Sequence, residues 1–234
     1  MRIPFAVFRV LAAALIVAAI VAQLQRSYGN WIAAGVTDVS FQFVNFFSFF
    51  TIEANALSIA VLLIGAIYAF ARKPDSVWFN VFRGSVATYM ITTGVVYNLL
   101  LRNVELPQGT TVAWSNEVLH VVAPLVLLID WLFAPGRLAM ASKAVWVIIS
   151  FPLVWGVYTL IRGPFAFDEI LQRNWYPYPF LNPDTSANGY LSVAFYMILI
   201  ALVVGAAGAG VISLSRRRVP FSTASSAVFS AASN

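Results

Sequence analysis

The sequence predicts an all-α polytopic membrane protein, a bundle of six transmembrane helices with both termini in the cytoplasm. Three observations support this prediction. Of the 234 residues, 61% are hydrophobic and only 10% are charged, whereas an ordinary soluble domain has roughly 45–50% and about 25%. Six stretches are long and apolar enough to cross about 30 Å of hydrocarbon. Finally, lysine and arginine gather in alternating connections between these stretches.

The six predicted spans each consist of a run of mostly apolar residues. They cover approximately residues 5–24, 44–71, 85–101, 118–133, 144–161 and 190–214. The third and fourth are the shortest, and the third is the most polar, so the count of six depends most on these two. We interpret residues 1–218 as one transmembrane domain. The tail 219–234 is rich in serine and alanine and has no amphipathic pattern, which predicts a disordered cytoplasmic segment.

The first span has a second interpretation. Arg2 precedes an apolar core that ends in AAIVAQ, as in a signal peptide with small residues near its cleavage site. We favour an uncleaved anchor, because the apolar run nearly reaches the length of a span and Arg9 lies inside it.

The orientation follows from the positive charges, since flanks rich in lysine and arginine stay in the cytoplasm. Ten of the fourteen basic residues fall in one alternating set of flanks. This set is Arg2, Arg9, Arg72, Lys73, Arg83, Arg137, Lys143, Arg216, Arg217 and Arg218. The other set holds Arg26, Arg102, Arg162 and Arg173. Both termini are therefore predicted to be cytoplasmic.

The longest connection, residues 163–189, contains the run WYPYPFLNP. Three prolines stiffen this run, and its aromatic residues suit the outer membrane interface. Two interpretations remain open, a lid or plug over the bundle and an aromatic belt that anchors it in the interface.

Composition and motifs exclude several function classes. The chain has no cysteine, so disulfides, thiolate metal sites and a cysteine nucleophile are ruled out. The only block of basic residues is 216–218, which is too little for a nucleic-acid-binding surface. A single histidine cannot supply a histidine-rich metal site. We therefore expect no metal, no cofactor and no nucleic-acid partner.

Polar side chains gather toward the predicted outer ends of the spans, where the second and fourth helices enter and the third and fifth exit. Inside a bilayer such groups are costly, so each is a candidate functional residue. The sequence predicts a polar chamber in the outer leaflet. Its candidates are Ser48, Thr51, Asn55 and Ser58 from the second span, Thr88, Thr92, Asn98 and Arg102 from the third, Asn116, Glu117 and His120 from the fourth, and Trp155, Tyr158, Thr159 and Arg162 from the fifth.

Thr51 and His120 are the candidates for chemistry. His120 is the only histidine, so a base that titrates near neutral pH has one candidate. A threonine nucleophile needs such a base, together with donors such as Asn55, Asn98 or Arg102 for the developing oxyanion. The predicted spans place Thr51 deeper than His120 by roughly 8 Å. The alternatives are a histidine that only bonds a neighbouring helix and a threonine that only bonds its own helix.

Two acids stay outside this chamber. Asp130, near the inner end of its span, is expected to meet Arg137 or the cytoplasmic headgroups. Glu53 lies on the opposite side of its helix from Thr51, so it is not assigned as a third catalytic residue.

Four motifs on these six spans resemble a known family. They are FFTIEAN, NEVLHVVAPLVLLIDWLF, YTLIRG and WYPYPFLNPDTSANGY. The chain up to its tail resembles the bacterial predicted six-transmembrane family, which is similar to the eukaryotic androgen-induced and androgen-dependent membrane hydrolases. The resemblance implies a multi-pass protein of a bacterial plasma membrane and, more distantly, hydrolysis of fatty acid esters of hydroxy fatty acids.

The resemblance also implies site residues. In the eukaryotic enzymes an intramembrane threonine follows an aromatic or aliphatic pair, and Thr51 follows Phe49 and Phe50. Their histidine follows an asparagine by four residues, as His120 follows Asn116.

The motif continues in the same way on the other side of the histidine. A proline and then an acid follow in the family, as Pro124 and Asp130 do here. The family's proline lies one residue further from the histidine, which is a departure. The run from Tyr178 to Leu181 matches the tyrosine–proline–phenylalanine–leucine run of the family's last loop.

The hypothesis from the sequence is a lipid-ester hydrolase in which His120 activates Thr51. The predicted binding residues are Asn55, Asn98, Arg102, Asn116 and Arg162. Of these, Arg102 or Arg162 would hold a carboxylate or phosphate headgroup, and the expected partner is a membrane lipid or lipid ester.

Two alternatives stay open. One is a non-enzymatic carrier or lipid-binding protein, for which we expect polar contacts through the whole membrane rather than toward one side. The other is a protein that keeps the family fold and has lost or changed the activity.

Overall fold

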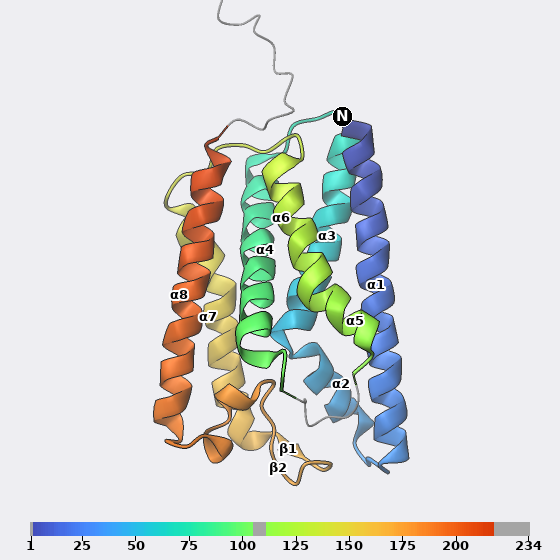
Figure 1. The fold of residues 1–234 in the computed structure, drawn as a ribbon, viewed down its shortest axis with the longest axis vertical. Helices are drawn as coiled ribbons and strands as arrows, with labels where there is room; N and C mark the ends of the chain where they lie inside the picture. The colour runs from blue at the N-terminus through green and yellow to red at the C-terminus, as the bar shows by residue number, and fades with distance from the viewer. Residues whose placement is uncertain (1, 105–110, 218–234) are drawn as a thin grey trace, which may run out of the picture.

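The computed structural model describes residues 2–104 and 111–217. The predicted tail 219–234 lies outside the described residues. Within them, six helical segments are long and apolar enough to cross a membrane, which confirms the all-α six-helix prediction (Figure 1). These segments are α1 (Arg2–Ala33), α3 (Phe50–Phe70), α4 (Val77–Val96) with the π-turn η1 (Tyr97–Leu101), α5 (Ala113–Glu117) with the π-turn η2 (Val118–Val122) and α6 (Ala123–Phe133), α7 (Ala144–Arg162) with η3 (Gly163–Phe165), and α8 (Tyr190–Ser215).

The remaining elements lie at one end of the bundle (Figure 1). They are the short helix α2 (Val39–Phe47), the antiparallel pair β1 (Phe167–Asp168) and β2 (Arg173–Asn174), and the 3₁₀ turns η4 (Pro179–Leu181) and η5 (Pro183–Thr185). The start of α1 and the end of α8 both lie at the opposite end, on different sides of the bundle (Figure 1), as an even number of spans requires. Following the predicted orientation, we call the end at which α1 begins and α8 ends the inner end and the other the outer end.

The helix α4 occupies the centre of the bundle. It packs against α3, α6, α7 and α8, and it is both the least apolar and the most buried of the six spans. The two properties belong together, since polar side chains in a membrane helix must face protein or water rather than lipid.

Small residues bring α1 and α3 together near the inner end of the bundle. Ala6 of α1 forms a buried cluster with Ala66 and Ala69 of α3. Without large side chains between them the two helices approach closely, which is the usual basis of helix association in a bilayer.

Four predicted spans have wrong boundaries. The first helix continues to Ala33 instead of ending near residue 24. The predicted span 44–71 is interrupted, because α2 ends at Phe47 and a new helix begins at Phe50. The third and fourth spans start earlier than predicted, at Val77 and Ala113. The predicted spans began only after the polar residues Arg83 and Glu117, because hydropathy excludes charged residues from a span. Both side chains form ion pairs within the protein, so the helices include them.

A cluster of four buried charges closes the inner half of the bundle. Asp130 accepts from Arg9 Nε at 2.6 Å and from Arg83 Nε at 2.8 Å, and Arg83 Nη1 donates to Asp75 at 2.7 Å. All four residues are buried. Two positive and two negative charges balance, which makes their burial tolerable.

This cluster corrects two expectations. Asp130 does not meet Arg137 or the headgroups; it joins α1, α4 and α6. Arg137 instead lies over the Trp131 ring and donates to the Trp131 carbonyl. Polar contacts are also not confined to the outer side, so their distribution no longer argues against a carrier.

Candidate functional site

Thr51 and His120 lie within hydrogen-bonding distance of each other at the outer end of the bundle. Thr51 Oγ1 is 3.3 Å from His120 Nε2, although the residues are 69 positions apart. The predicted depth difference of roughly 8 Å disappears for a simple reason. Thr51 is only the second residue of α3, and His120 lies seven residues into a span that begins at Ala113.

The backbone carbonyl of Asn116 sets the tautomer of His120. His120 Nδ1 lies 2.9 Å from this oxygen, and a carbonyl can only accept a hydrogen bond, so Nδ1 carries the proton. Nε2 then presents its lone pair to the hydroxyl of Thr51. This is the arrangement in which an imidazole acts as a base toward a hydroxyl nucleophile.

The π-turn η2 places His120 at this position. Pro124 has no N–H to donate to the carbonyl of His120 four residues earlier, so the regular α-helical pattern cannot continue there. A Cβ built on Gly94 of α4 would lie 3.1 Å from the Pro124 ring and 3.6 Å from the His120 carbonyl. Glycine at this point therefore lets α4 approach η2 closely. Such π-turns are frequent at functional sites.

Tyr97, at the start of the other π-turn, covers the imidazole. The rings of Tyr97 and His120 stack at 4.1 Å between centroids with an interplanar angle of 23°. The Tyr97 hydroxyl accepts from Asn116 Nδ2 at 2.5 Å. Asn116 thus orients His120 through its carbonyl and Tyr97 through its amide.

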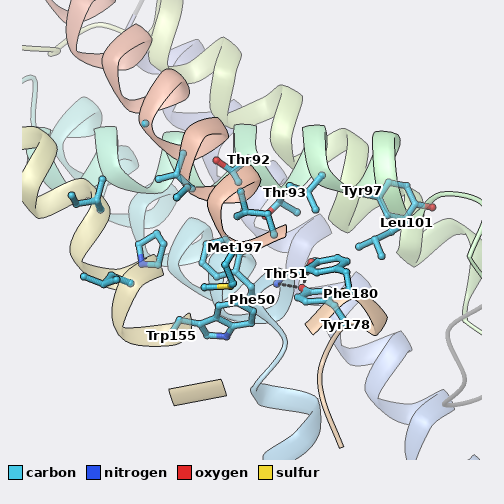
Figure 2. A pocket seen from close by; sticks show the side chains of 18 of the residues that line it. Phe50, Thr51, Thr92, Thr93, Tyr97, Leu101, Trp155, Tyr178, Phe180 and Met197 are labelled. Atoms are coloured by element: carbon cyan, nitrogen blue, oxygen red, sulfur yellow. Dashed lines mark hydrogen bonds between the residues drawn. The ribbon is translucent and has the colours of Figure 1, made fainter. Parts of the chain in front are cut away.

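Tyr178, from the long outer connection, completes the surroundings of Thr51. Its hydroxyl accepts from the Thr51 backbone N–H at 3.2 Å and lies 3.2 Å from Thr51 Oγ1 (Figure 2). Burial raises the pKa of Tyr178 to about 12, so the phenol keeps its proton at neutral pH and can donate it. Tyr178 and its neighbour Trp175 are buried, so these side chains pack into the protein, which favours the plug over the interfacial belt.

Thr51 also lies in the first turn of α3, with Phe49 as the N-cap residue. The backbone N–H groups of a first turn have no partner within the helix and carry partial positive charge. Negative charge that develops at or beside Thr51 Oγ1 is therefore stabilised.

A cavity of about 410 Å³ adjoins these residues. Its wall consists mainly of apolar side chains from α4, η1, α7 and α8, and it includes Thr51, His120 and Tyr178. Figure 2 shows Thr51 and Tyr178 next to each other in this wall. Along α7 it extends from Val145 to Trp155, which is about 15 Å at 1.5 Å per residue. These dimensions suit an extended apolar ligand.

The cavity reaches the surface of the bundle between α7 and α8. Leu153 and Trp146 of α7 belong to its wall and are also strongly exposed. On the α8 side, no atom lies within 4 Å of a Cβ built on Gly205, another wall residue. A ligand could therefore enter sideways from the lipid.

Two threonines of α4 have free hydroxyls in the wall. Thr92 and Thr93 line the cavity, are buried, and their hydroxyls have no hydrogen-bond partner. By contrast, Ser85 and Thr88 one to two turns earlier donate to carbonyls of their own helix. Thr92 and Thr93 are thus available to a polar group of a ligand.

The other predicted binding residues lie around the cavity rather than in it. Asn55 Nδ2 donates to the carbonyls of Thr51 and Leu119 at 2.8 and 3.1 Å, which ties α3 to η2. Asn98 is exposed and bonds Gly94. None of the predicted oxyanion donors Asn55, Asn98 and Arg102 belongs to the cavity wall.

The two predicted headgroup arginines differ. Arg102 bonds Asn98, as the spacing of four residues predicts, and its Nη2 pairs with Glu117 at 2.7 Å. Arg162 lies at the end of α7, where its Nη2 donates to Asn45 at 2.7 Å. Of the two, Arg102 already has a carboxylate partner.

Sequence reasoning did not assign Tyr97 and Tyr178 to the site. Tyr178 lies in the aromatic, proline-rich run 175–183. Two signals pointed to this run, its possible role as a plug and the resemblance of Tyr178–Leu181 to the family's last loop, but neither assigned Tyr178 to the site. Tyr97 directly precedes Asn98 and carries no signal of its own. In the described parts of the chain, no group of three or more histidines and acids could hold a metal ion.

Comparison with known proteins gives no match among family models, curated proteins or solved structures.

Proposed function

We propose that this protein is an integral-membrane hydrolase of lipid esters, with Thr51 as the nucleophile and His120 as the general base. One observation carries the proposal. His120 lies between the Thr51 hydroxyl, at its Nε2, and the Asn116 carbonyl, at its Nδ1. Thr51 and His120 belong to the wall of an apolar cavity. The motif resemblance to the bacterial six-transmembrane family, and through it to the threonine hydrolases, supports the same pair.

The reaction begins with attack on the ester. His120 Nε2 takes the proton of Thr51 Oγ1 as this oxygen forms a bond to the ester carbonyl carbon. The carbonyl oxygen becomes an oxyanion, which the Tyr178 hydroxyl and the positive end of α3 stabilise. His120 then returns its proton to the departing alkoxide. The alcohol leaves, and an acyl-threonine remains.

Water completes the cycle. His120 Nε2 removes a proton from a water molecule while the water oxygen attacks the acyl carbon. The second tetrahedral intermediate collapses as the C–Oγ1 bond breaks and Thr51 regains its proton from His120. A carboxylic acid leaves and the enzyme is restored. The 3.3 Å separation of Thr51 and His120 is ordinary for a ligand-free site and is expected to shorten on binding.

The cavity favours lipid as the substrate class. Its apolar wall would hold an acyl chain, and its opening between α7 and α8 faces the hydrocarbon in which such chains reside. A polar ester at the outer end would then meet Thr51. This fits an enzyme of a plasma membrane that acts from the outer leaflet.

The test is covalent labelling of the purified protein by a fluorophosphonate probe. We expect labelling to be lost in Thr51→Ala and His120→Ala and retained in Thr51→Ser, which keeps a hydroxyl. Ser58→Ala is the matched control, because Ser58 lies two turns further along α3 and bonds its own helix at Ala54. Circular dichroism would confirm that all variants fold.

Two results would contradict the proposal. Unchanged labelling of Thr51→Ala would exclude the threonine as nucleophile. A folded wild type that neither labels nor hydrolyses esters would favour the lipid carrier, and a lipid that copurifies with the protein would then be the ligand to identify.

A further inference from the structure

Arg162 forms a second cluster of polar groups at the outer end, beside the site described above. Its guanidinium lies 5.2 Å from the rings of Phe41 and Trp175, and Nη2 donates to Asn45. In residues 2–104 and 111–217, no carboxylate forms an ion pair with Arg162, whereas Arg102 pairs with Glu117. Arg162 therefore keeps its full positive charge in a partly buried position.

Two buried donors near Arg162 have no acceptor. They are Gln42 Nε2 and Trp175 Nε1, and each residue is only 3% exposed. A buried donor without a partner is costly, so native proteins rarely retain one without a ligand or a water molecule to satisfy it. Trp175 packs against the Arg162 guanidinium, and Gln42 is connected to the same guanidinium through Asn45.

The orientation of Gln42 follows from a chain of hydrogen bonds. Arg162 can only donate, so the oxygen of Asn45 must face it, and Asn45 Nδ2 turns toward Gln42 Oε1 at 3.4 Å. The carboxamide nitrogen of Gln42 is then left as the free end. An amide flip of Gln42 would place its nitrogen against that of Asn45 and lose this bond.

We infer that Arg162, Gln42 and Trp175 form a binding site for an oxyanion, a carboxylate or phosphate group. A cation and two neutral donors match such a group, while a cationic ligand would be repelled. The inference rests on the proposed function in one respect, since it assigns an anionic headgroup to the substrate. Of the two arginines predicted to bind a headgroup, Arg102 and Arg162, the inference assigns this role to Arg162.

The site is connected to the nucleophile through one aromatic side chain. Phe49 contacts Trp175 and Tyr178, with ring centroids 5.6 and 5.7 Å apart, and it precedes Thr51 by two residues. Tyr178 contacts Thr51 and belongs to the cavity wall, so the headgroup site and the cavity lie on two sides of the same aromatic cluster.

The experiment measures binding rather than hydrolysis. The melting temperature of Thr51→Ala protein in neutral detergent is followed during titration with dioctanoyl phosphatidate, with dioctanoyl glycerol, and with inorganic phosphate. Using Thr51→Ala keeps the result independent of catalysis, so failure here and failure of the labelling test are distinguishable. Further variants are Arg162→Gln and Trp175→Phe, which keeps an aromatic side chain, although a smaller one, and removes the N–H donor. Arg26→Gln is the control, an exposed arginine at the same end.

We expect phosphatidate to bind more tightly than the uncharged diglyceride. Arg162→Gln should weaken phosphatidate binding by about ten- to a hundredfold and Trp175→Phe by about two- to tenfold, with no change in Arg26→Gln. Tighter binding of phosphatidate than of inorganic phosphate would identify a lipid headgroup, and equal affinities would identify a free anion. Equal binding of phosphatidate and diglyceride, or a preference that survives in Arg162→Gln, would overturn the inference.

Discussion

The phenol oxygen of Tyr178 lies 3.2 Å from both the backbone nitrogen and the side-chain oxygen of Thr51, 127 positions earlier in the chain. The long outer connection therefore supplies a functional group to the first turn of α3. In the proposed reaction this hydroxyl donates to the oxyanion.

Tyr178→Phe is expected to slow ester hydrolysis by about 10²- to 10³-fold, the usual cost of losing one oxyanion donor. The measurement is turnover of a medium-chain 4-nitrophenyl ester by purified protein. Tyr68→Phe is the control, because Tyr68 donates to Ser76 at the inner end and is remote from the cavity. Similar rates for Tyr178→Phe and the wild type would remove Tyr178 from the mechanism.

The raised pKa of Tyr178 predicts a particular pH dependence of stability. The folded protein holds this phenol neutral up to a pKa of about 12, whereas an unfolded tyrosine ionises near 10. The contribution of Tyr178 to stability should thus be complete below about pH 10 and decline as the pH rises toward 12. Melting temperatures of wild type and Tyr178→Phe, compared from pH 8 to 11.5, should keep a constant difference up to about pH 10. Above that pH, the wild type should lose stability faster.

Gly205→Phe is expected to shorten the acyl chain that the protein accepts. Gly205 lines the inner part of the cavity, and its missing side chain leaves open space. Turnover of 4-nitrophenyl butyrate should stay near the wild-type rate, while turnover of the dodecanoate should fall at least tenfold. Gly210→Phe, on the same helix with similar space but outside the cavity wall, should leave both rates unchanged. An equal loss for both esters in Gly205→Phe would indicate a general disturbance instead.

Asp130→Asn is expected to reduce the free energy of unfolding by about 3–5 kcal/mol, because it leaves Arg9 and Arg83 buried without sufficient countercharge. Arg137→Gln should cost less, since Arg137 forms no ion pair with Asp130. The check is the midpoint of denaturation in detergent for both variants. A larger loss of unfolding free energy in Arg137→Gln than in Asp130→Asn would instead support the contact between Asp130 and Arg137 that the sequence predicted.

Hydropathy alone was sufficient for the fold class and the number of spans, because an apolar run about 20 residues long is a local property. It was insufficient for the span boundaries. At Arg83 and Glu117 the pattern stops, yet the helices continue, since Asp130 of α6 pairs with Arg83 and Arg102, at the end of the preceding span, pairs with Glu117. Local sequence cannot report a partner 47 positions away, as in the pair of Arg83 and Asp130.

The sequence by itself determined a membrane environment, six helices and Thr51 with His120 as the pair to consider, because hydropathy, residue type and rarity can be read along one chain. Only the tertiary structure decided which groups meet. It brought Tyr178 to Thr51, gave Asp130 to Arg9, and left Asn98 outside the cavity. The physical reason is that such contacts depend on helix rotation, on the two π-turns and on the path of a long loop. Packing among all six helices sets these features.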